Sequence, residues 1–212
     1  MQSRLLSQQA GVDHGFLPPG ESPGVAYWRP KQVHGALILA TRPAGSAREP
    51  ADGVVSTDPA VAAAVVSADC VALLLATGDG GSVAAVHVGW RGLAGGVVEA
   101  GVDAVRRAHP GSPLVAALGP AASGCCYEVG PEVLAAVAAG PARVSPTREG
   151  HARLDLRGAV ADRLLSLGVS EHSIDVVGPC TICSPAWPSY RREGRVAGRI
   201  LSYIVPASPS RR

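Results

Sequence analysis

The stretch AAVHVGWRGLAGG, residues 84–96, constrains the fold more than any other part of the chain. Its first half is a run of small apolar residues that predicts a buried strand, with His87 near the strand end. The chain then breaks into Gly-Trp-Arg-Gly, and a helical pattern begins at about Leu93. The stretch therefore predicts a strand, a turn and a helix in succession, with a polar side chain where the strand ends.

Strand-like runs dominate the first half of the chain. Six short runs, separated by turns rich in Pro, Gly, Asp and Ser, predict one extended β region: residues 24–28, 36–40, 52–56, 62–67, 71–76 and 83–89. Further along, the patterns predict helices over 93–108, 131–139 and 156–167, strands over 114–119, 174–178 and 199–205, and loops over 42–50 and 140–150. Because helices and strands do not alternate regularly, the predicted fold class is α+β.

The composition is typical of a globular protein with one core. Of 212 residues, 47% are hydrophobic and 17% are charged, and the chain is rather short for two ordinary domains. The formal net charge is only +2, so we expect no nucleic-acid partner, and any anion binding must be local. No signal peptide and no apolar run long enough to span a bilayer is found, so we expect a cytoplasmic protein without membrane association.

Three polar residues lie at the margins of predicted strands. They are His34 in KQVHG, Cys70 in SADC and His87 in VAAVHVG. Strand ends can bring distant residues together, and one cysteine with two histidines suits zinc, with a fourth position left for water or substrate. No motif spacing links the three. The residues alone therefore leave open whether they are ligands, hydrogen-bonded structural histidines or a buried thiol.

The segment GWRG, residues 89–92, suggests an anion pocket. Its two glycines permit close backbone approach where a helix begins, and Arg91 adds a bidentate donor. A simple turn with Trp90 packed and Arg91 solvated explains the same residues.

Four further cysteines occupy the second half of the chain. Cys125 and Cys126 are adjacent, whereas Cys180 and Cys183 form a CxxC pair. A closed zinc site needs a second pair of spaced cysteines, and adjacent Cys125 and Cys126 do not provide one, which argues against a four-cysteine site. The CxxC motif does not begin an evident helix, which argues against a thioredoxin-like redox pair. We therefore expect these cysteines to be packing residues.

Taken together, the motifs resemble one family, the laccase-domain or YfiH-like proteins, variously called polyphenol oxidases, purine nucleoside phosphorylases and peptidoglycan editing factors. The similar pieces follow in order through most of the chain: QVHG at 32–35, ADGVVS at 51–56, SADC at 67–70, AAVHVGWRG at 84–92, LGPAASGCCYEVGPEV at 118–133, LDL at 154–156 and SYRREG at 189–194. Each piece is modest, but their shared order makes the resemblance specific.

The resemblance implies a fold, a metal and a reaction. The fold is a single α+β domain over residues 1–212, with mixed β-sheets flanked by helices. His34, Cys70 and His87 would be the metal ligands, the metal would be Zn²⁺ rather than copper, and Arg91 would lie in or near an anion site. The implied reactions are phosphorolysis of adenosine, inosine or related nucleosides, and deamination of adenosine, so a nucleoside and phosphate are the expected partners of a protein that we expect to be a monomer.

The N-terminal part departs from the family pattern. Between GVDHGF at 11–16 and QVHG, members of the family carry a longer segment than the fifteen residues 17–31 found here. We therefore expect a shortened N-terminal segment before residue 31, with part of the substrate pocket wall changed.

Phosphorolysis also needs a catalytic group that donates a proton to the leaving base, and Asp69 and Glu128 are the candidates. Arg91 is the third predicted catalytic residue, as the anion binder. Asp69 could instead orient a metal-bound imidazole.

Three alternatives compete with a zinc phosphorylase. A copper oxidase would need clustered imidazoles, whereas the six histidines here are scattered. A cysteine hydrolase acting on an amide, as in peptidoglycan precursor editing, would use Cys70 as nucleophile and a histidine as base. A non-catalytic nucleoside-binding protein would explain the shortened segment.

Overall fold

Strand β6 (Val71–Thr77) lies at the centre of the molecule and is buried on both faces. In this computed structural model, which describes residues 1–8, 12–138 and 143–208, its odd-numbered side chains such as Leu73 pack towards helices. Its even-numbered side chains, such as Leu74, pack towards a second sheet. This two-sided burial explains why the run is apolar throughout instead of alternating.

The central sheet has six strands in the order β12-β8-β6-β7-β4-β3. Only the outer pairs, β12 with β8 and β3 with β4, are parallel, so the sheet is mixed. Besides β6, its strands are β3 (Ile38–Ala40), β4 (Gly53–Ser56), β7 (Val83–Val88), β8 (Leu114–Leu118) and β12 (Ile174–Val176).

A second sheet of four strands covers one face of the central sheet. Its order is β1-β13-β5-β2, with strands β1 (Asp13–Leu17), β2 (Tyr27–Trp28), β5 (Ala62–Ser67) and β13 (Ile200–Val205). Phe16, Trp28 and Ile204 fill the space between the two sheets together with Leu74. Burial of these large side chains contributes the main favourable free energy that holds the two sheets together.

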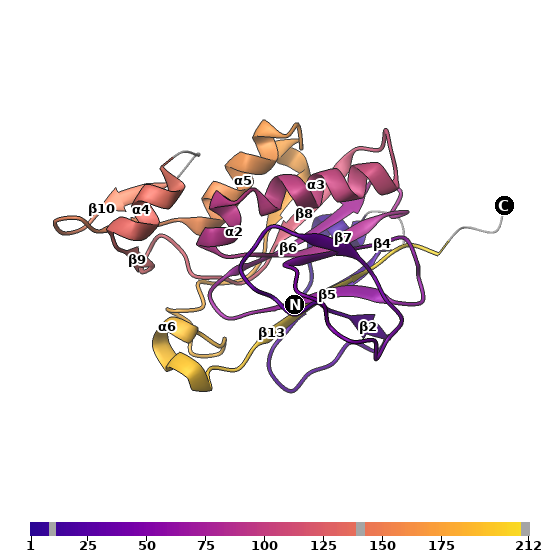
Figure 1. Ribbon diagram of the computed structural model, residues 1–212, viewed down its shortest axis with the longest axis horizontal. Helices are drawn as coiled ribbons and strands as arrows, with labels where there is room; N and C mark the ends of the chain where they lie inside the picture. Colours follow the sequence, from indigo (N-terminus) through magenta and orange to yellow (C-terminus); the bar gives the residue numbers. More distant parts are fainter. Residues whose placement is uncertain (9–11, 139–142, 209–212) are drawn as a thin grey trace.

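Helices cover the opposite face of the central sheet (Figure 1). Helix α3 lies over β6 and β7 and packs against α5, and an ion pair of 3.0 Å between Glu99 and Arg163 joins the two helices. Helix α1 (Arg4–Gln8) lies on the other side, where Leu6 packs in the same core as Phe16 and Leu74. The other helices of the described residues are α2 (Trp90–Ala94), α3 (Val97–Ala108), α4 (Pro131–Val137), α5 (Leu156–Ser166) and α6 (Tyr190–Glu193), with 3₁₀ turns at Glu171–Ser173 and Gly194–Val196.

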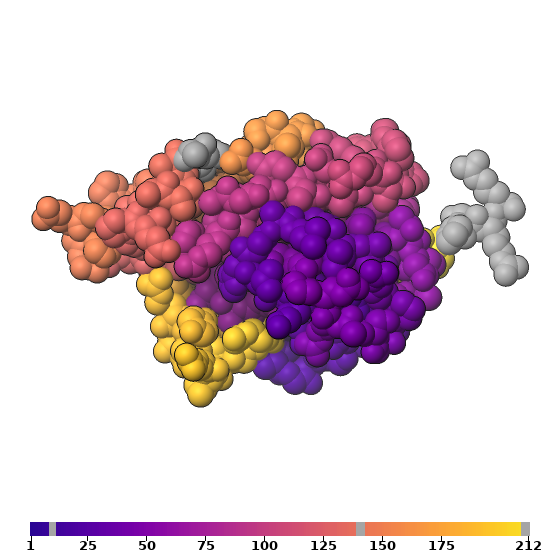
Figure 2. All heavy atoms as spheres, in the orientation of Figure 1, coloured from indigo at the N-terminus to yellow at the C-terminus, as the bar shows by residue number. Residues whose placement is uncertain are grey.

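A small third sheet projects from one end of the molecule. It has the order β10-β11-β9, with strands β9 (Glu128–Val129), β10 (Val144–Pro146) and β11 (Ala152–Leu154). Together with α4 it forms the protrusion at the left of the space-filling view (Figure 2).

The structure confirms the α+β fold class and the mixed sheets flanked by helices, but three sequence-based expectations were wrong. The six early strands do not form one β region, because β2 and β5 join the second sheet. The helix expected over 93–108 begins at Trp90 and is broken at Gly96, which has φ +83°. The loop expected over 140–150 contains β10, and residues 139–142 lie outside the described part of the chain.

Among the residues that the structure describes, no helix has both the length and the apolar character needed to cross a membrane.

Candidate metal centre and adjoining pocket

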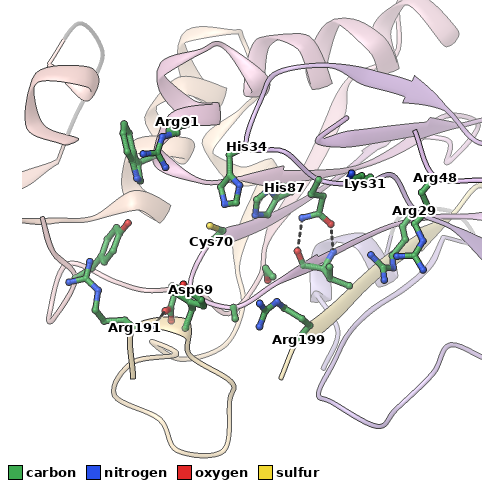
Figure 3. Close-up of a pocket in the computed structure, with 17 residues that line it drawn as sticks. Arg29, Lys31, His34, Arg48, Asp69, Cys70, His87, Arg91, Arg191 and Arg199 are labelled. Carbon is green, nitrogen blue, oxygen red and sulfur yellow. Dashed lines mark hydrogen bonds between the residues drawn. The ribbon is translucent and has the colours of Figure 1, made fainter. Parts of the chain in front are cut away.

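His34, Cys70 and His87 converge at one edge of the central sheet (Figure 3). One possible ligand atom from each lies within 4.8 Å of those of the other two. His87 is in β7, opposite Ala72 of β6, so Cys70 at the start of β6 lies beside it. His34 comes from the loop before β3, and its ring meets that of His87 edge to face at 4.9 Å between centroids.

Asp52 holds two of these residues in place and was not among the sequence-based candidates. It is fully buried, and its Oδ1 accepts a hydrogen bond of 3.0 Å from Nδ1 of His87. The same carboxylate accepts from three successive backbone N–H groups, those of Val33, His34 and Gly35. These bonds stabilise the left-handed backbone of His34, whose φ is +61°. A buried aspartate immediately before a strand, in ADGVVS, was the available signal.

Because Gly89 has no side chain, there is room beside it for the cluster of His34, Cys70 and His87. A Cβ atom at this position would lie 3.0 Å from Cδ2 of His34 and 3.1 Å from Sγ of Cys70. Its φ of −86° is open to any residue, so the requirement for glycine here is steric. This explains the first glycine of GWRG.

Gln32 ties the His34 loop to the second sheet. Its side-chain amide donates to the carbonyl of Val66 and accepts from the Val66 N–H, at 2.7 and 2.8 Å. The amide thereby continues the hydrogen bonding at the end of β5 and fixes the position of the loop. The dashed lines in Figure 3 mark this pair.

The cluster has unusual protonation properties. Burial opposes ionisation of Cys70, but hydrogen bonds with His34 and His87 lower its pKa to about 6. Burial also opposes a charge on His87, but its hydrogen bonds with Asp52 and Cys70 raise its pKa to about 9. Without a metal ion, a thiolate therefore faces an imidazolium at neutral pH.

The cluster also fits a metal ion such as zinc. Because Asp52 binds Nδ1 of His87, Nε2 of that ring is free to act as a ligand. Three nitrogen and sulfur donors that leave one position open are typical of catalytic zinc sites. Whether these residues bind an ion, and whether the ion is zinc or copper, stays a prediction.

A cavity of about 740 Å³ adjoins the cluster and is strongly cationic. Asp69 is the only carboxylate among the described residues that line it, whereas six cations do so: Arg29, Lys31, Arg48, Arg91, Arg191 and Arg199. In Figure 3, Arg91 and Arg191 lie to the left of the cluster, Arg29 and Arg48 to the right, and Arg199 below it. This arrangement suits an anionic ligand.

Arg91 lines the cavity and lies within α2, not before the helix. Its guanidinium stacks on Trp90 at 4.2 Å from the ring centroid and donates to Glu132 at 3.3 Å. The side chain is 57% exposed, so it is accessible to a ligand.

The expectation that Asp69 could orient a metal-bound imidazole was wrong. Asp52 orients His87 instead. The carboxylate of Asp69 accepts hydrogen bonds from Thr181 Oγ1, Ser189 Oγ and the Arg191 backbone N–H. Its backbone carbonyl accepts from Ala122 N–H. Asp69 thus joins three chain segments that form the cavity wall.

Glu128 is not among the residues that line the cavity. Its carboxylate pairs with Arg148 at 3.0 Å, and only its backbone carbonyl reaches towards the site, by accepting from Arg191. The neighbouring Tyr127 lines the cavity instead, with the guanidinium of Arg191 5.2 Å from its ring centroid. The sequence analysis missed Tyr127, Arg191 and the more distant arginines because only the fold brings them together.

The expectation that the four remaining cysteines are packing residues was wrong for most of them, since only Cys180 is buried. Cys125 and Cys183 are exposed, and the possible ligand atoms of Cys125, Cys126, Cys180 and Cys183 all lie within 4.8 Å of one another. Burial opposes ionisation of Cys180, but hydrogen bonds from the Cys183 N–H and from Cys126, Ser123 and Cys125 lower its pKa to about 6. Adjacent thiols and a CxxC pair thus converge at one point.

The fold and the two clusters define a mixed α/β protein with Cys/His groups that could bind metal ions. Residues 21–207 match the family described as multi-copper polyphenol oxidoreductase laccase, and the chain belongs to this family.

Named relatives and solved structures agree with this assignment. The chain is 39% identical over 191 residues to a purine nucleoside phosphorylase of Xylella fastidiosa, which covers 85% of the chain and 72% of the relative. It is 40% identical over 190 residues to one of Streptomyces coelicolor, covering 87% and 76%. The crystal structure of YlmD from Geobacillus stearothermophilus is similar with a TM-score of 0.80 and 31% identity, covering 86% of this chain and 74% of that one. Bacillus licheniformis YfiH gives a TM-score of 0.78 with 26% identity, covering 85% and 74%.

Proposed function

We propose that this protein is a zinc-dependent purine nucleoside phosphorylase that also deaminates adenosine. The observation that carries the proposal is the position of the His34, Cys70 and His87 cluster at a cavity lined by six cations and a single carboxylate among the described residues. Phosphate is the anionic co-substrate of phosphorolysis, so such a cavity fits it. The names of the relatives support the same reaction.

In this reaction an oxygen of phosphate forms a bond to C1′ of the ribose while the bond from C1′ to the base nitrogen breaks. The bonding electron pair leaves with the purine, which takes up a proton, and the sugar becomes ribose 1-phosphate. Arg91 and Arg191 line one side of the cavity, where they would hold the phosphate and offset its charge. Arginine forks bind phosphate oxygens in pairs, which also fixes the direction of attack.

His34, Cys70 and His87 would hold the zinc ion. The bound ion would supply a Lewis acid that stabilises negative charge, both in phosphorolysis and in hydrolytic loss of the adenine amino group. Asp52 would keep His87 in the tautomer that presents Nε2.

Three residues near the site could donate the proton to the leaving base, namely Asp69, Glu128 and Tyr127. Asp69 lines the cavity, but its carboxylate accepts three hydrogen bonds from Thr181, Ser189 and the Arg191 backbone, which hold it against the protein. Glu128 pairs with Arg148 outside the cavity lining. Tyr127 fits the role better, since burial first, and then the charges of Cys70 and Asp69, raise the pKa of its phenol and keep it protonated.

One observation favours a second function. The spatial arrangement of Cys70, His87 and Asp52 is like that of the nucleophile, the base and the orienting carboxylate in cysteine hydrolases. Such an enzyme would attack an amide with the Cys70 thiolate and would not need a metal ion.

The test is an assay of free purine base released from adenosine and inosine, with and without phosphate, and with metal content measured on the same sample. Phosphate-dependent release that is lost with chelator and restored by zinc is the expected result. Cys70→Ser should lose both the ion and the activity, whereas Arg107→Ala, on an exposed part of α3 away from the cavity, should keep both. Activity that persists in chelator but is lost on alkylation would overturn the proposal in favour of the hydrolase, and ligand binding without turnover would favour a non-catalytic protein.

A further inference from the structure

The four cysteines outside the cavity form a second, separate cluster. Cys125 and Cys126 lie on a turn in which the backbone N–H groups of Cys126 and Tyr127 both donate to the Ser123 carbonyl. This helix-like turn lets adjacent side chains point to a common place, with their sulfur atoms 3.4 Å apart. Cys180 and Cys183 approach from a second segment that follows β12.

The four sulfur atoms lie close enough together to share one metal ion, at separations somewhat shorter than those of an ideal tetrahedral zinc site. Sγ of Cys126 lies 2.9 Å from that of Cys183 and 3.3 Å from that of Cys180, and Cys125 lies 3.5 Å from Cys183. Zinc–sulfur bonds of about 2.3 Å place the four sulfurs of a tetrahedron about 3.8 Å apart. A disulfide needs about 2.0 Å, and all four thiols are free.

The backbone around the cluster is already held in place. Thr181 N–H donates to the Ala121 carbonyl at 3.1 Å, which joins the two cysteine-bearing segments. Arg157 adds a second connection, since it donates to the Gly178 carbonyl and to Ser123 Oγ. Ligands fixed in this way need little rearrangement to bind an ion.

Positive charge lies next to the cluster. Arg192 donates to the carbonyls of Thr181 and Ile182, within the loop that carries Cys180 and Cys183. Arg157 lies against the residues that flank both cysteine pairs. Zinc bound by four thiolates carries two net negative charges, which the Arg157 guanidinium offsets, whereas Arg192 contributes less because it is paired with Glu193.

We propose that Cys125, Cys126, Cys180 and Cys183 bind a structural zinc ion that fastens the segment carrying the cavity residue Tyr127 to the loop that supports Asp69. Cys126 precedes Tyr127, which lines the cavity, and the Cys180–Cys183 loop contains Thr181, which donates to Asp69. Asp69 in turn fixes the backbone of Arg191. The ion closes its coordination with protein ligands alone, and it acts on the cavity through the positions of Tyr127 and Arg191.

The first experiment is a count of bound zinc in the reduced, full-length protein after reconstitution with zinc and desalting. Two ions per chain are expected, about one at each cluster. The double variant Cys125→Ser and Cys183→Ser should lose one ion, and because both side chains are exposed, the substitutions disturb little packing. Cys70→Ser is the matched control, which should lose only the ion at the other cluster and keep the four-cysteine one.

A second measurement, made on the unmutated protein and on both variants, reports which ligands hold the ion. Cobalt substitution should give the strong sulfur-to-cobalt charge-transfer absorption of a tetrathiolate site, retained in Cys70→Ser and lost in the double variant. The four thiols should resist alkylation until chelator is added. Equal zinc in the double variant and the unmutated protein, absence of the tetrathiolate cobalt absorption in Cys70→Ser, or disulfides among the four cysteines under reducing conditions would each overturn the proposal. A single zinc ion that is retained in Cys70→Ser and lost in the double variant would instead support this site and argue against an ion at the other cluster.

Discussion

The carboxylate of Asp52 lies 3.0 Å from Nδ1 of His87 and also accepts hydrogen bonds from the loop that carries His34. One buried side chain therefore sets the orientation of one histidine and the backbone of the other. Both of its oxygens accept hydrogen bonds. Oδ1 accepts from Nδ1 of His87 and from the His34 N–H, and Oδ2 accepts from the Val33 and Gly35 N–H groups. An amide in its place has only one acceptor oxygen.

Asp52→Asn should therefore weaken metal binding by roughly 10- to 100-fold, because either His87 or the His34 loop loses its acceptor. The measurement is zinc affinity by competition with a chromogenic chelator. Asp103→Asn on the exposed side of α3 is the matched control and should bind zinc as the unmutated protein does. Unchanged affinity in Asp52→Asn would show that this carboxylate does not position the ligand.

Gly89→Ala should lower metal occupancy and activity together, because the new methyl group meets both His34 and Cys70 within about 3.1 Å. Gly24→Ala serves as control, since a Cβ there has no atom within 4 Å. Bound zinc and thermal unfolding of both variants are compared with those of the unmutated protein. Full zinc occupancy in Gly89→Ala would mean that the cluster can shift to make room and that the glycine is not required.

Arg91→Ala should raise the KM for phosphate roughly tenfold or more, since a hydrogen bond to a charged group contributes about 1.5–3 kcal/mol. Stability should change little because the side chain is largely exposed. Arg107→Ala at the exposed end of α3 removes the same charge away from the cavity and should leave the KM unchanged. Equal KM values in the two variants would remove Arg91 from the phosphate site.

Acid should destabilise the protein in part through His14. This ring is buried, its Nε2 accepts from Ser3 N–H, and burial lowers its pKa despite the nearby charge of Asp13. The unfolded chain then binds a proton that the folded chain does not, so the His14 contribution falls as pH decreases below about 6.5, by at most about 1.4 kcal/mol per pH unit.

His14→Gln should remove this part of the pH dependence, measured as free energy of unfolding in urea between neutral and mildly acidic pH. Exposed His172→Gln should retain it. If the slopes of His14→Gln and the unmutated protein were the same, the ring would not be held neutral by burial.

Much of the cavity's chemistry could be predicted from local sequence. His34, Cys70 and His87 stood out because polar residues at strand margins contrast with the apolar runs around them, and the structure brings the three together. Arg91 stood out because it follows a glycine at a strand end, and it lines the cavity. Their roles as ligands and as phosphate binder stay predictions.

Other features could not be found in this way. Asp69 and Glu128 are each close in sequence to a residue of the site, yet the carboxylate of Asp69 ties loops together and that of Glu128 pairs with Arg148. The direction of a side chain depends on backbone torsions and distant donors, such as Thr181 for Asp69, which neighbours in sequence do not reveal. The cluster of four cysteines could not be predicted from local sequence either. A turn at Ser123 brings the adjacent thiols of Cys125 and Cys126 to the CxxC pair, which is distant in the sequence.

The sequence by itself determined the order of most strands and helices and the residue types available for chemistry, because apolar periodicity and turn residues act over a few neighbouring positions. Only the tertiary structure decided which strands belong to which sheet, that Asp52 orients His87, and that two cysteine pairs meet. These arrangements depend on contacts between residues far apart in the chain. Their free energy comes from burying apolar faces and satisfying polar groups between whole elements, which no local pattern records.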